Sequence, residues 1–519
     1  MTSRHYDVVV LGRTLGALAT AALLARRDFR VLLLGQGQRP ASYRFDRYRF
    51  QRRTFTLLTG SSPAWRRVLQ ELGQTPRFRR RTMALDPMFA VLSDTRRVEV
   101  PPDVELFSRE VDREFPEVRQ LVDELYSTFA FVNGAADAAW ERDAVWPPGT
   151  FYEKVETRRI ATTLPFVGHD RHQDLLGKFP PHHPFRDLVL VPALFATDIT
   201  TSNRQLPLFA LARLHGAWTR GVNALGGGED ELEQFLIERI EAHGGTCRLR
   251  GRAASIVIRR GRAIGVHEEG EEEPVGAEAV VTDQSGETLA ALANGAGITP
   301  RARRDWPHLE VTAGRFVTSL VVRRRGLPEP LPVESFCLPR RGAVADPRQP
   351  ELRVQRLDLP EGTAAEAETL LVAEALLPSR GPLTLLEARA ATVAALAVQF
   401  PFLQEHLLAV DSPHDGLPLQ LYDGGRMREI DRVHVQETSP LAEQMQWQWS
   451  VDPPGFLELG GEPVRGPIPG TYLAGKTVLP ALGQEGELLA AWSVARVIAQ
   501  RNRGRQRMRR QMWTKIETG

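Results

Sequence analysis

The segment from residue 6 to residue 37 constrains the fold of this chain more than any other. Residues 8–11 form a continuous apolar run with β-branched side chains, which is typical of a strand buried in a parallel sheet. Gly12 then permits a sharp turn, residues 16–25 are rich in Ala and Leu and favour a helix, and residues 30–34 are a second apolar strand. This order predicts a β-α-β unit.

The turn in this unit departs from the pattern that binds a dinucleotide. In a G-x-G-x-x-G/A turn, the second glycine lets the backbone approach a pyrophosphate that rests on the helix N-terminus. Residues 12–17 read GRTLGA, so Thr14 replaces that glycine, whereas Ala17 is allowed at the third position. Gly35 and Gln36 stand where an acidic residue would meet the ribose. The segment therefore predicts the fold and leaves the cofactor open.

Composition is that of an ordinary globular protein, with 42% hydrophobic and 25% charged residues. The 519 residues suffice for two or three domains, and a net charge of +2 indicates no particular partner. Cys247 and Cys337 form no CxxC motif, which fits a reducing compartment. No signal peptide precedes the first strand and no uncharged run is long enough to cross a bilayer, so we expect a cytoplasmic protein.

Periodicity and turn residues predict the remaining organisation. Residues 61–200 are expected to be mostly helical with Pro-rich breaks, and residues 305–440 to mix strands and helices. The predicted helices include 230–242, 363–375, 385–399 and 487–499, and the predicted strands include 247–250, 255–258, 263–266, 277–282 and 471–474. The Arg- and aromatic-rich stretch 38–60 is expected to be extended with solvated arginines, and no nucleic-acid motif accompanies it.

Three segments in this order resemble the phytoene-desaturase-like branch of the FAD-dependent amine-oxidase-fold proteins, which includes carotenoid desaturases and isomerases and retinol saturases. They are residues 6–37, the glycine–helix–hairpin block at 226–283, and GTYLAGKTVLPALGQEGELLAAWSVARVI at 470–498. The resemblance implies an α/β fold in which a Rossmann-like FAD/NAD(P)-binding domain is interleaved with an α+β substrate domain. The first domain would comprise residues 1–60, 210–300 and 440–500, the second 61–209 and 301–439, with 501–519 as a basic tail.

The resemblance also implies a cofactor and a ligand. FAD would perform hydride chemistry on a hydrophobic, isoprenoid-like small molecule held in a tunnel, so no catalytic side chain is assigned. The residues that would contact FAD are Gly12, Arg13, Thr14, Gly16, Ala17, Gln36, Ala253, Gly475, Lys476, Gly483 and Gly486.

Departures from the family pattern gather at this site. Lys476 stands where the family has an aspartate, and Leu482 interrupts a turn that is glycine-rich in the family. Together with Thr14 and Gly35 they weaken the expected FAD affinity, although Lys476 or Arg13 could pair with a phosphate. Two more side chains, those of Glu485 and Glu487, flank the start of the last helix. There they would oppose a reduced flavin anion, although acids are also common in the first turn of any helix.

Two other features call for an interpretation. His169, His172, His182 and His183 lie in a Pro-rich stretch and are expected to be loop side chains, so no metal site is predicted. In the tail, Met508, Met512 and Ile516 recur every four residues among seven basic side chains. If helical, this tail could lie on the anionic inner face of a membrane or contact a protein partner; alternatively it is a frayed, solvated end.

Three functions remain open from these residues. The favoured one is a flavin-less relative that binds an isoprenoid- or lipid-like molecule or acts as a partner subunit, because the departures gather at the dinucleotide pocket. The alternative is an active FAD-dependent desaturase, saturase or isomerase acting on a hydrophobic polyene. Thr14 and the missing acidic residue disfavour a nicotinamide-dependent enzyme.

Overall fold

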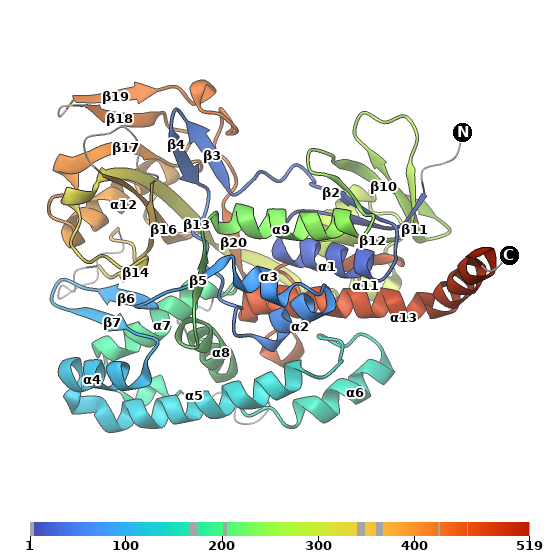
Figure 1. Ribbon diagram of the computed structural model, residues 1–519, viewed down its shortest axis with the longest axis horizontal. Helices are drawn as coiled ribbons and strands as arrows, with labels where there is room; N and C mark the ends of the chain where they lie inside the picture. The colour runs from blue at the N-terminus through green and yellow to red at the C-terminus, as the bar shows by residue number, and fades with distance from the viewer. Residues whose placement is uncertain are drawn as a thin grey trace.

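A computed structural model of the chain shows two large β-sheets, each covered by helices (Figure 1). It describes residues 5–166, 174–200, 205–339, 348–359, 367–423, 426–453 and 455–517, with the backbone alone from residue 502 onward. Among these residues no helix combines the length and the hydropathy needed to span a bilayer. The predicted α/β class is confirmed.

The first sheet collects strands from three distant parts of the chain. Its order is β10-β11-β12-β1-β2-β9, and β21 pairs with β12. The strands are β1 (His5–Leu11), β2 (Val31–Leu34), β9 (Thr246–Arg248), β10 (Ala253–Arg259), β11 (Arg262–Glu268), β12 (Val275–Thr282) and β21 (Thr471–Leu473). The pairs β1–β2, β1–β12 and β12–β21 are parallel. Leu11 lies opposite Leu34 and Thr282, and Thr282 lies opposite Leu473, so these strands end at one edge.

Helices α1 (Leu15–Arg26), α9 (Gly228–Ala242) and α13 (Gln484–Glu517) pack together beside this sheet (Figure 1). α1 contacts both of the others, and its Ala- and Leu-rich sequence is buried along nearly its whole length. Two short helices, α10 (Gly286–Leu292) and α11 (Pro300–Asp305), follow β12. The backbone of the basic tail continues α13 to Glu517.

The second sheet has ten strands in the order β19-β18-β17-β13-β16-β15-β14-β6-β7, with β20 paired to β13. They are β6 (Phe89–Leu92), β7 (Arg97–Val100), β13 (His308–Arg323), β14 (Glu334–Cys337), β15 (Leu352–Asp358), β16 (Glu368–Pro378), β17 (Leu407–Asp411), β18 (Leu419–Asp423), β19 (Arg426–Ile430) and β20 (Gln446–Asp452). Alternate residues of its strands form a core with α12 (Leu385–Gln399). The hairpin β3 (Ser42–Phe45) and β4 (Tyr48–Gln51) covers part of the opposite face, as expected for an extended 38–60 stretch.

A helical layer completes the molecule (Figure 1). Its helices are α2 (Pro63–Glu71), α3 (Thr75–Arg79), α4 (Val104–Glu114), α5 (Arg119–Trp140), α6 (Phe151–Ala161), α7 (Pro184–Ala196) and α8 (Leu208–Thr219). A two-stranded ribbon of β5 (Thr82–Ala84) and β8 (Asn223–Leu225) also joins segments that are far apart in sequence. The predicted helicity of residues 61–200 is confirmed for most of their described part.

One predicted element is wrong. The helix expected at 363–375 is replaced by β16, which pairs with β13 along its whole length and with β15 on its other side. Its Leu, Ala and Glu residues favour helix locally, but pairing on both edges and burial of residues 369–375 override that preference. The helix expected at 385–399 is confirmed as α12.

Candidate dinucleotide-binding site

Parallel pairing brings Asp283 to the glycine turn. The turn connects β1 to α1, and Thr282 at the end of β12 lies opposite Leu11 at the end of β1. The next residue, Asp283, donates its backbone N–H to the carbonyl of Leu11 at 3.1 Å. The carboxyl end of β12 therefore delivers an acidic side chain to the place where the turn would cradle a phosphate.

The Asp283 carboxylate accepts the backbone hydrogen bonds of this turn. The N–H groups of Arg13 and Thr14 each donate to its Oδ2 at 3.0 Å, and the Gln38 amide donates at 3.0 Å. Gly12 has φ +125°, and a Cβ atom there would lie 2.0 Å from Oδ2. The glycine thus leaves room for a carboxylate of the chain itself. Burial raises the pKa of Asp283, whereas these hydrogen bonds lower it.

A second carboxylate caps α1. Oε2 of Glu487, on α13, accepts the N–H of Gly16 at 3.2 Å, in the first turn of α1. A negative group is favoured there by the free N–H groups and the helix dipole. Burial raises the pKa of Glu487 to about 7, although the nearby Lys476 ammonium acts in the opposite direction.

These contacts do not fit an FAD pyrophosphate. A pyrophosphate on this turn would need the N–H groups that Asp283 and Glu487 already occupy. It would also bring negative charge against two buried carboxyl groups, where the low dielectric strengthens repulsion. No reaction step through a flavin is therefore derived for this arrangement.

Neither of the two cations predicted to meet a phosphate is directed at such a ligand. Arg13 Nε donates to Glu233 Oε1 at 2.6 Å, and its Nη1 donates to the Gln38 carbonyl at 3.1 Å. The Lys476 ammonium donates to Gln446 Oε1 at 3.1 Å and lies 3.6 Å from Asp198 Oδ1. Both positive charges are committed to partners within the protein.

The position expected to bind a ribose is also satisfied internally. Gln36 exchanges two hydrogen bonds with the backbone of Ala253: its Nε2 donates to the carbonyl at 3.1 Å, and its Oε1 accepts the N–H at 2.9 Å. Gly35 lies so close to Leu249 that a Cβ atom would be 1.9 Å from the Leu249 carbonyl oxygen. Gln36 and Ala253, each predicted to contact the cofactor, are thus hydrogen-bonded to each other.

The remaining predicted residues serve packing. Ala17 is fully buried in the core. A Cβ atom at Gly475 would lie 1.9 Å from the Asp283 carbonyl oxygen, at Gly483 2.0 Å from that of Ala196, and at Gly486 2.2 Å from that of Leu479. Gly16 approaches the Ala474 carbonyl in the same way. These glycines allow α1, β21 and the start of α13 to pack closely.

A buried ion pair lies at the start of α13, where the flavin ring is expected. Glu485 is buried and forms an ion pair with Arg213 of α8, whose Nε donates at 2.9 Å, and it accepts a hydrogen bond from Ser62 at 2.5 Å. Burial raises the pKa of Glu485, but Arg213 outweighs this effect and leaves it lowered. The adjoining cavity, which Leu482 also lines, has a volume of about 20 Å³, enough for one or two waters. Glu485 and Glu487 both lie in the first turn of α13, where acidic residues are common, and both are buried beside specific partners.

Charged side chains also fill the junction between the two sheets. Asp198 lies between Lys476 and Arg315, at 3.6 and 3.8 Å, and Arg315 Nη1 donates to Glu374 of β16 at 2.6 Å. Glu374 in turn accepts a hydrogen bond from Thr54. Of these five side chains only that of Lys476 is as much as a quarter exposed. We call this chain of ion pairs the junction network; it places charged side chains between the two sheets.

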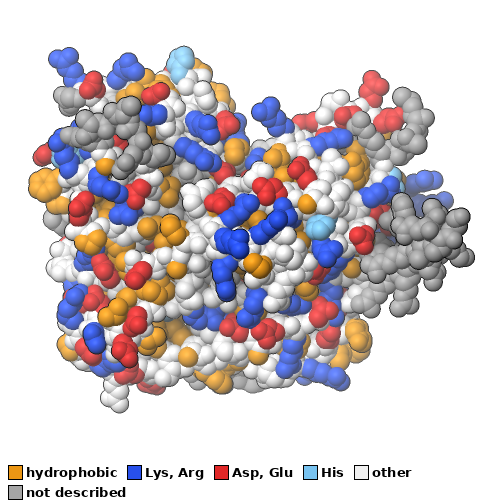
Figure 2. Space-filling model, in the orientation of Figure 1, with side chains coloured by type: hydrophobic (Ala, Val, Ile, Leu, Met, Phe, Trp, Pro, Cys, Tyr) orange, Lys and Arg blue, Asp and Glu red, His pale blue; other side chains and the backbone are white. Residues whose placement is uncertain are grey.

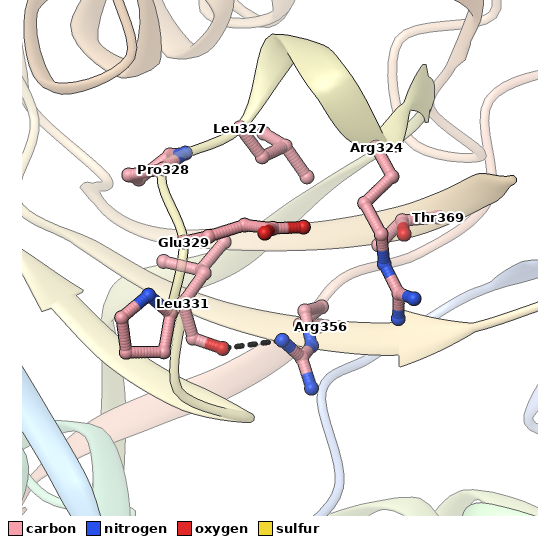
Figure 3. A pocket seen from close by; sticks show the side chains of 8 residues that line it. Arg324, Leu327, Pro328, Glu329, Leu331, Arg356 and Thr369 are labelled. Carbon is pink, nitrogen blue, oxygen red and sulfur yellow. Dashed lines mark hydrogen bonds between the residues drawn. The ribbon is translucent and has the colours of Figure 1, made fainter.

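A larger cavity lies on the second sheet. It has a volume of about 440 Å³ and is lined at its rim by Arg324, Glu329 and Arg356 (Figure 3). Arg356 donates to the Leu331 carbonyl at 2.5 Å, and Arg324 pairs with Asp358 at 2.8 Å. None of the residues predicted to contact a dinucleotide lines it.

The described residues contain no group of three or more His, Cys, Asp or Glu side chains arranged to hold a metal ion. His183 bonds Glu117 at 2.9 Å and caps α7, while His169 and His172 lie outside the described residues. Cys247 is partly buried and Cys337 is buried, and burial raises the pKa of each thiol to about 12. A role as inert side chains is in line with these pKa values.

Sequence reasoning missed Asp283 and Gln38. The signal for Asp283 was available: an acidic residue directly follows a buried strand, and the carboxyl ends of neighbouring parallel strands meet at one edge. No sequence pattern indicated Gln38, because it lies in the irregular turn after β2, and this turn, not a helix or strand, orients its amide.

Comparisons with known proteins agree with this architecture. Residues 10–72 match the family model of the NAD(P)-binding Rossmann-like domain. The fold is similar to that of an oxidoreductase from Methanosarcina mazei, with a TM-score of 0.56 and 15% identity over 94% of this chain and 100% of that one. It is also similar to a redesigned putrescine oxidase, with a TM-score of 0.54 and 15% identity over 96% and 99%. No curated protein matches the sequence significantly. The chain thus carries an NAD(P)-binding Rossmann-like domain within a two-domain fold that oxidoreductases share.

Proposed function

We propose that the chain is a divergent phytoene-desaturase-like protein that works without FAD, as a partner subunit or ligand-binding protein. The observation that carries this proposal is the engagement of the glycine-turn N–H groups by Asp283 and Glu487. Charged hydrogen bonds are worth about 1.5–3 kcal/mol each, so a pyrophosphate that must displace two of them loses several orders of magnitude in affinity. The three matching sequence segments support the desaturase-like branch.

Between the two flavin-less roles, the junction network supports the partner subunit. An isoprenoid- or lipid-like molecule would be held by apolar walls, whereas Arg315 and Glu374 place a buried ion pair between the sheets. The chain therefore acts through its surface on a partner.

An active FAD-dependent oxidoreductase is the second candidate. Two features favour it: Gly12 keeps the positive φ of +125° that a glycine turn of this kind uses, and the fold is similar to that of an oxidoreductase. In that case Asp283 and Glu487 would have to leave the turn for FAD to bind, and a hydrophobic polyene would be the substrate to test. The two candidates differ in whether the wild-type chain retains FAD.

The test removes the two carboxylates. Asp283→Asn with Glu487→Gln keeps the shape of each side chain and removes both ionisable carboxyl groups. FAD retained after desalting, measured over a range of FAD concentrations, is expected to be negligible for the wild type and at least about tenfold higher for the double variant. Glu462→Gln is the matched control, because Glu462 is also buried and caps the first turn of another helix, α10, at Gly286.

The outcomes separate the proposals. Tight FAD binding by the wild type contradicts the flavin-less proposal. Thr14→Gly with Lys476→Asp, which restores the family residues, is expected to raise FAD affinity only when Asp283 is replaced as well. A gain from that pair alone would mean that the departures in sequence, and not the carboxylates in the turn, limit binding.

A further inference from the structure

Helix α6 presents three large apolar side chains to solvent. Phe151 is 84% exposed, Tyr152 77% and Val155 40%, and all three lie in the first half of the helix. Contiguous exposed apolar side chains mark interaction surfaces more often than single scattered ones do.

Cations share the same face. Lys154, Arg158 and Arg159 are exposed, and none pairs with a carboxylate among the described residues. At 100° per residue the six exposed positions occupy one continuous arc of α6, whereas Glu153, Thr157 and Ile160 point inward and are buried. The arc contains no acidic residue. Figure 2 shows basic and hydrophobic side chains together at the corner of the molecule that carries α6.

The helix is held firmly in place. A capping box joins Thr150 and Glu153, and Arg465 binds the Glu153 carboxylate through two hydrogen bonds of 2.6 and 2.8 Å. Arg496 of α13 pairs with Glu156, at the edge of the arc, at 3.1 Å. Arg496 lies five residues before Arg501, where the basic tail begins, so α6 and the continuing α13 lie at the same side of the molecule (Figure 1).

We propose that this α6 face docks on an anionic lipid bilayer. Aromatic and aliphatic side chains on one arc can enter the headgroup region, while neighbouring Lys and Arg side chains contact anionic headgroups. The absence of an acidic residue from the arc gives it the charge that complements such a surface and sets it apart from the mixed charges of an ordinary solvated helix. The surface lies away from the glycine turn and does not depend on FAD binding.

The test is cosedimentation of the full chain with vesicles of phosphatidylcholine containing phosphatidylserine. Each cation near such a surface is worth about 1 kcal/mol, so Lys154→Gln, Arg158→Gln, Arg159→Gln is expected to weaken binding on the order of 100-fold. Phe151→Ser with Tyr152→Ser is expected to weaken it at least about tenfold. All five side chains are exposed, so the variants are expected to fold like the wild type.

A second triple variant is the matched control. Arg77→Gln, Arg79→Gln, Arg80→Gln removes three cations from α3 and the residue after it, where the one aromatic side chain, Phe78, is buried. Wild-type vesicle binding by this control supports the α6 surface.

Several results would overturn the proposal. Equal losses of vesicle binding in both triple variants would mean that the net charge of the protein, and not the α6 face, controls binding. Loss of all binding on deletion of 501–519, with none in the α6 variants, would assign docking to the tail alone. If the wild type does not bind vesicles and the α6 variants change their oligomeric state, the α6 face binds a second copy of this chain and not a membrane.

Discussion

Replacing Glu487 by Gln is expected to remove one specific pH dependence of stability. In the unfolded chain a glutamate titrates near about 4.3, whereas burial raises the pKa of Glu487 to about 7 in the folded protein. Between these values the folded state holds a proton that the unfolded state has released. The free energy of unfolding therefore decreases as the pH rises from about 4.3 to about 7, and this contribution is flat above that range.

The magnitude follows from the two pKa values. One pKa unit corresponds to about 1.4 kcal/mol, so the contribution of Glu487 amounts to about 3 kcal/mol between about pH 4.3 and about pH 8. Its side chain is only 4% exposed, so solvent screening does not reduce this value much. The glutamine side chain of the variant is neutral at every pH, and its carbonyl oxygen can still accept the Gly16 N–H.

The assay is urea unfolding followed by tryptophan fluorescence at pH 5, 6, 7 and 8. Relative to the wild type, Glu487→Gln is expected to gain about 2.5 kcal/mol in unfolding free energy between pH 5 and pH 8. Glu241→Gln, an exposed position on α9, is the control for the chemistry of the substitution. Parallel curves for the wild type and Glu487→Gln would refute the assignment of a buried, protonatable carboxyl group at the end of α1.

Two further predictions concern buried groups. Arg213→Met leaves Glu485 unpaired in the interior and is expected to lower the free energy of unfolding by about 3–5 kcal/mol. The double variant Arg213→Met with Glu485→Gln is expected to lower it clearly less. Additive losses from the two single substitutions would show that the pair is not coupled. Burial raises the pKa of Cys247 and Cys337 to about 12, so a disulfide reagent at pH 8 is expected to label neither thiol rapidly until urea is added. Fast labelling of both thiols in the native protein would contradict these raised pKa values.

Local sequence patterns predicted the framework of the first sheet well. The strands at 8–11 and 277–282 and the helix at 16–25 follow from continuous apolar runs and Ala-rich composition, which act over a few residues. The prediction of a helix at 363–375 was wrong because β16 forms there instead, paired with β13 and β15 from other parts of the chain. Propensity is local, and such pairing is not.

The candidate site was predictable only in part. Thr14 and Lys476 were recognised as departures because they stand inside known turn patterns. Asp283 was not recognised because it comes 270 residues after Arg13 and approaches it only through the parallel pairing of β1 and β12. The burial of Glu487 could not be read from its position in a first helical turn, since that position is compatible with solvent as well as with the end of α1.

The most direct test of the central claim is the visible absorption spectrum of the purified wild-type protein, before and after incubation with FAD and desalting. We predict no bound-flavin absorption in either sample, because Asp283 and Glu487 hold the N–H groups that a pyrophosphate would need. A flavin spectrum near one per chain in either sample would contradict the account and make the protein an oxidoreductase to be tested with polyene substrates.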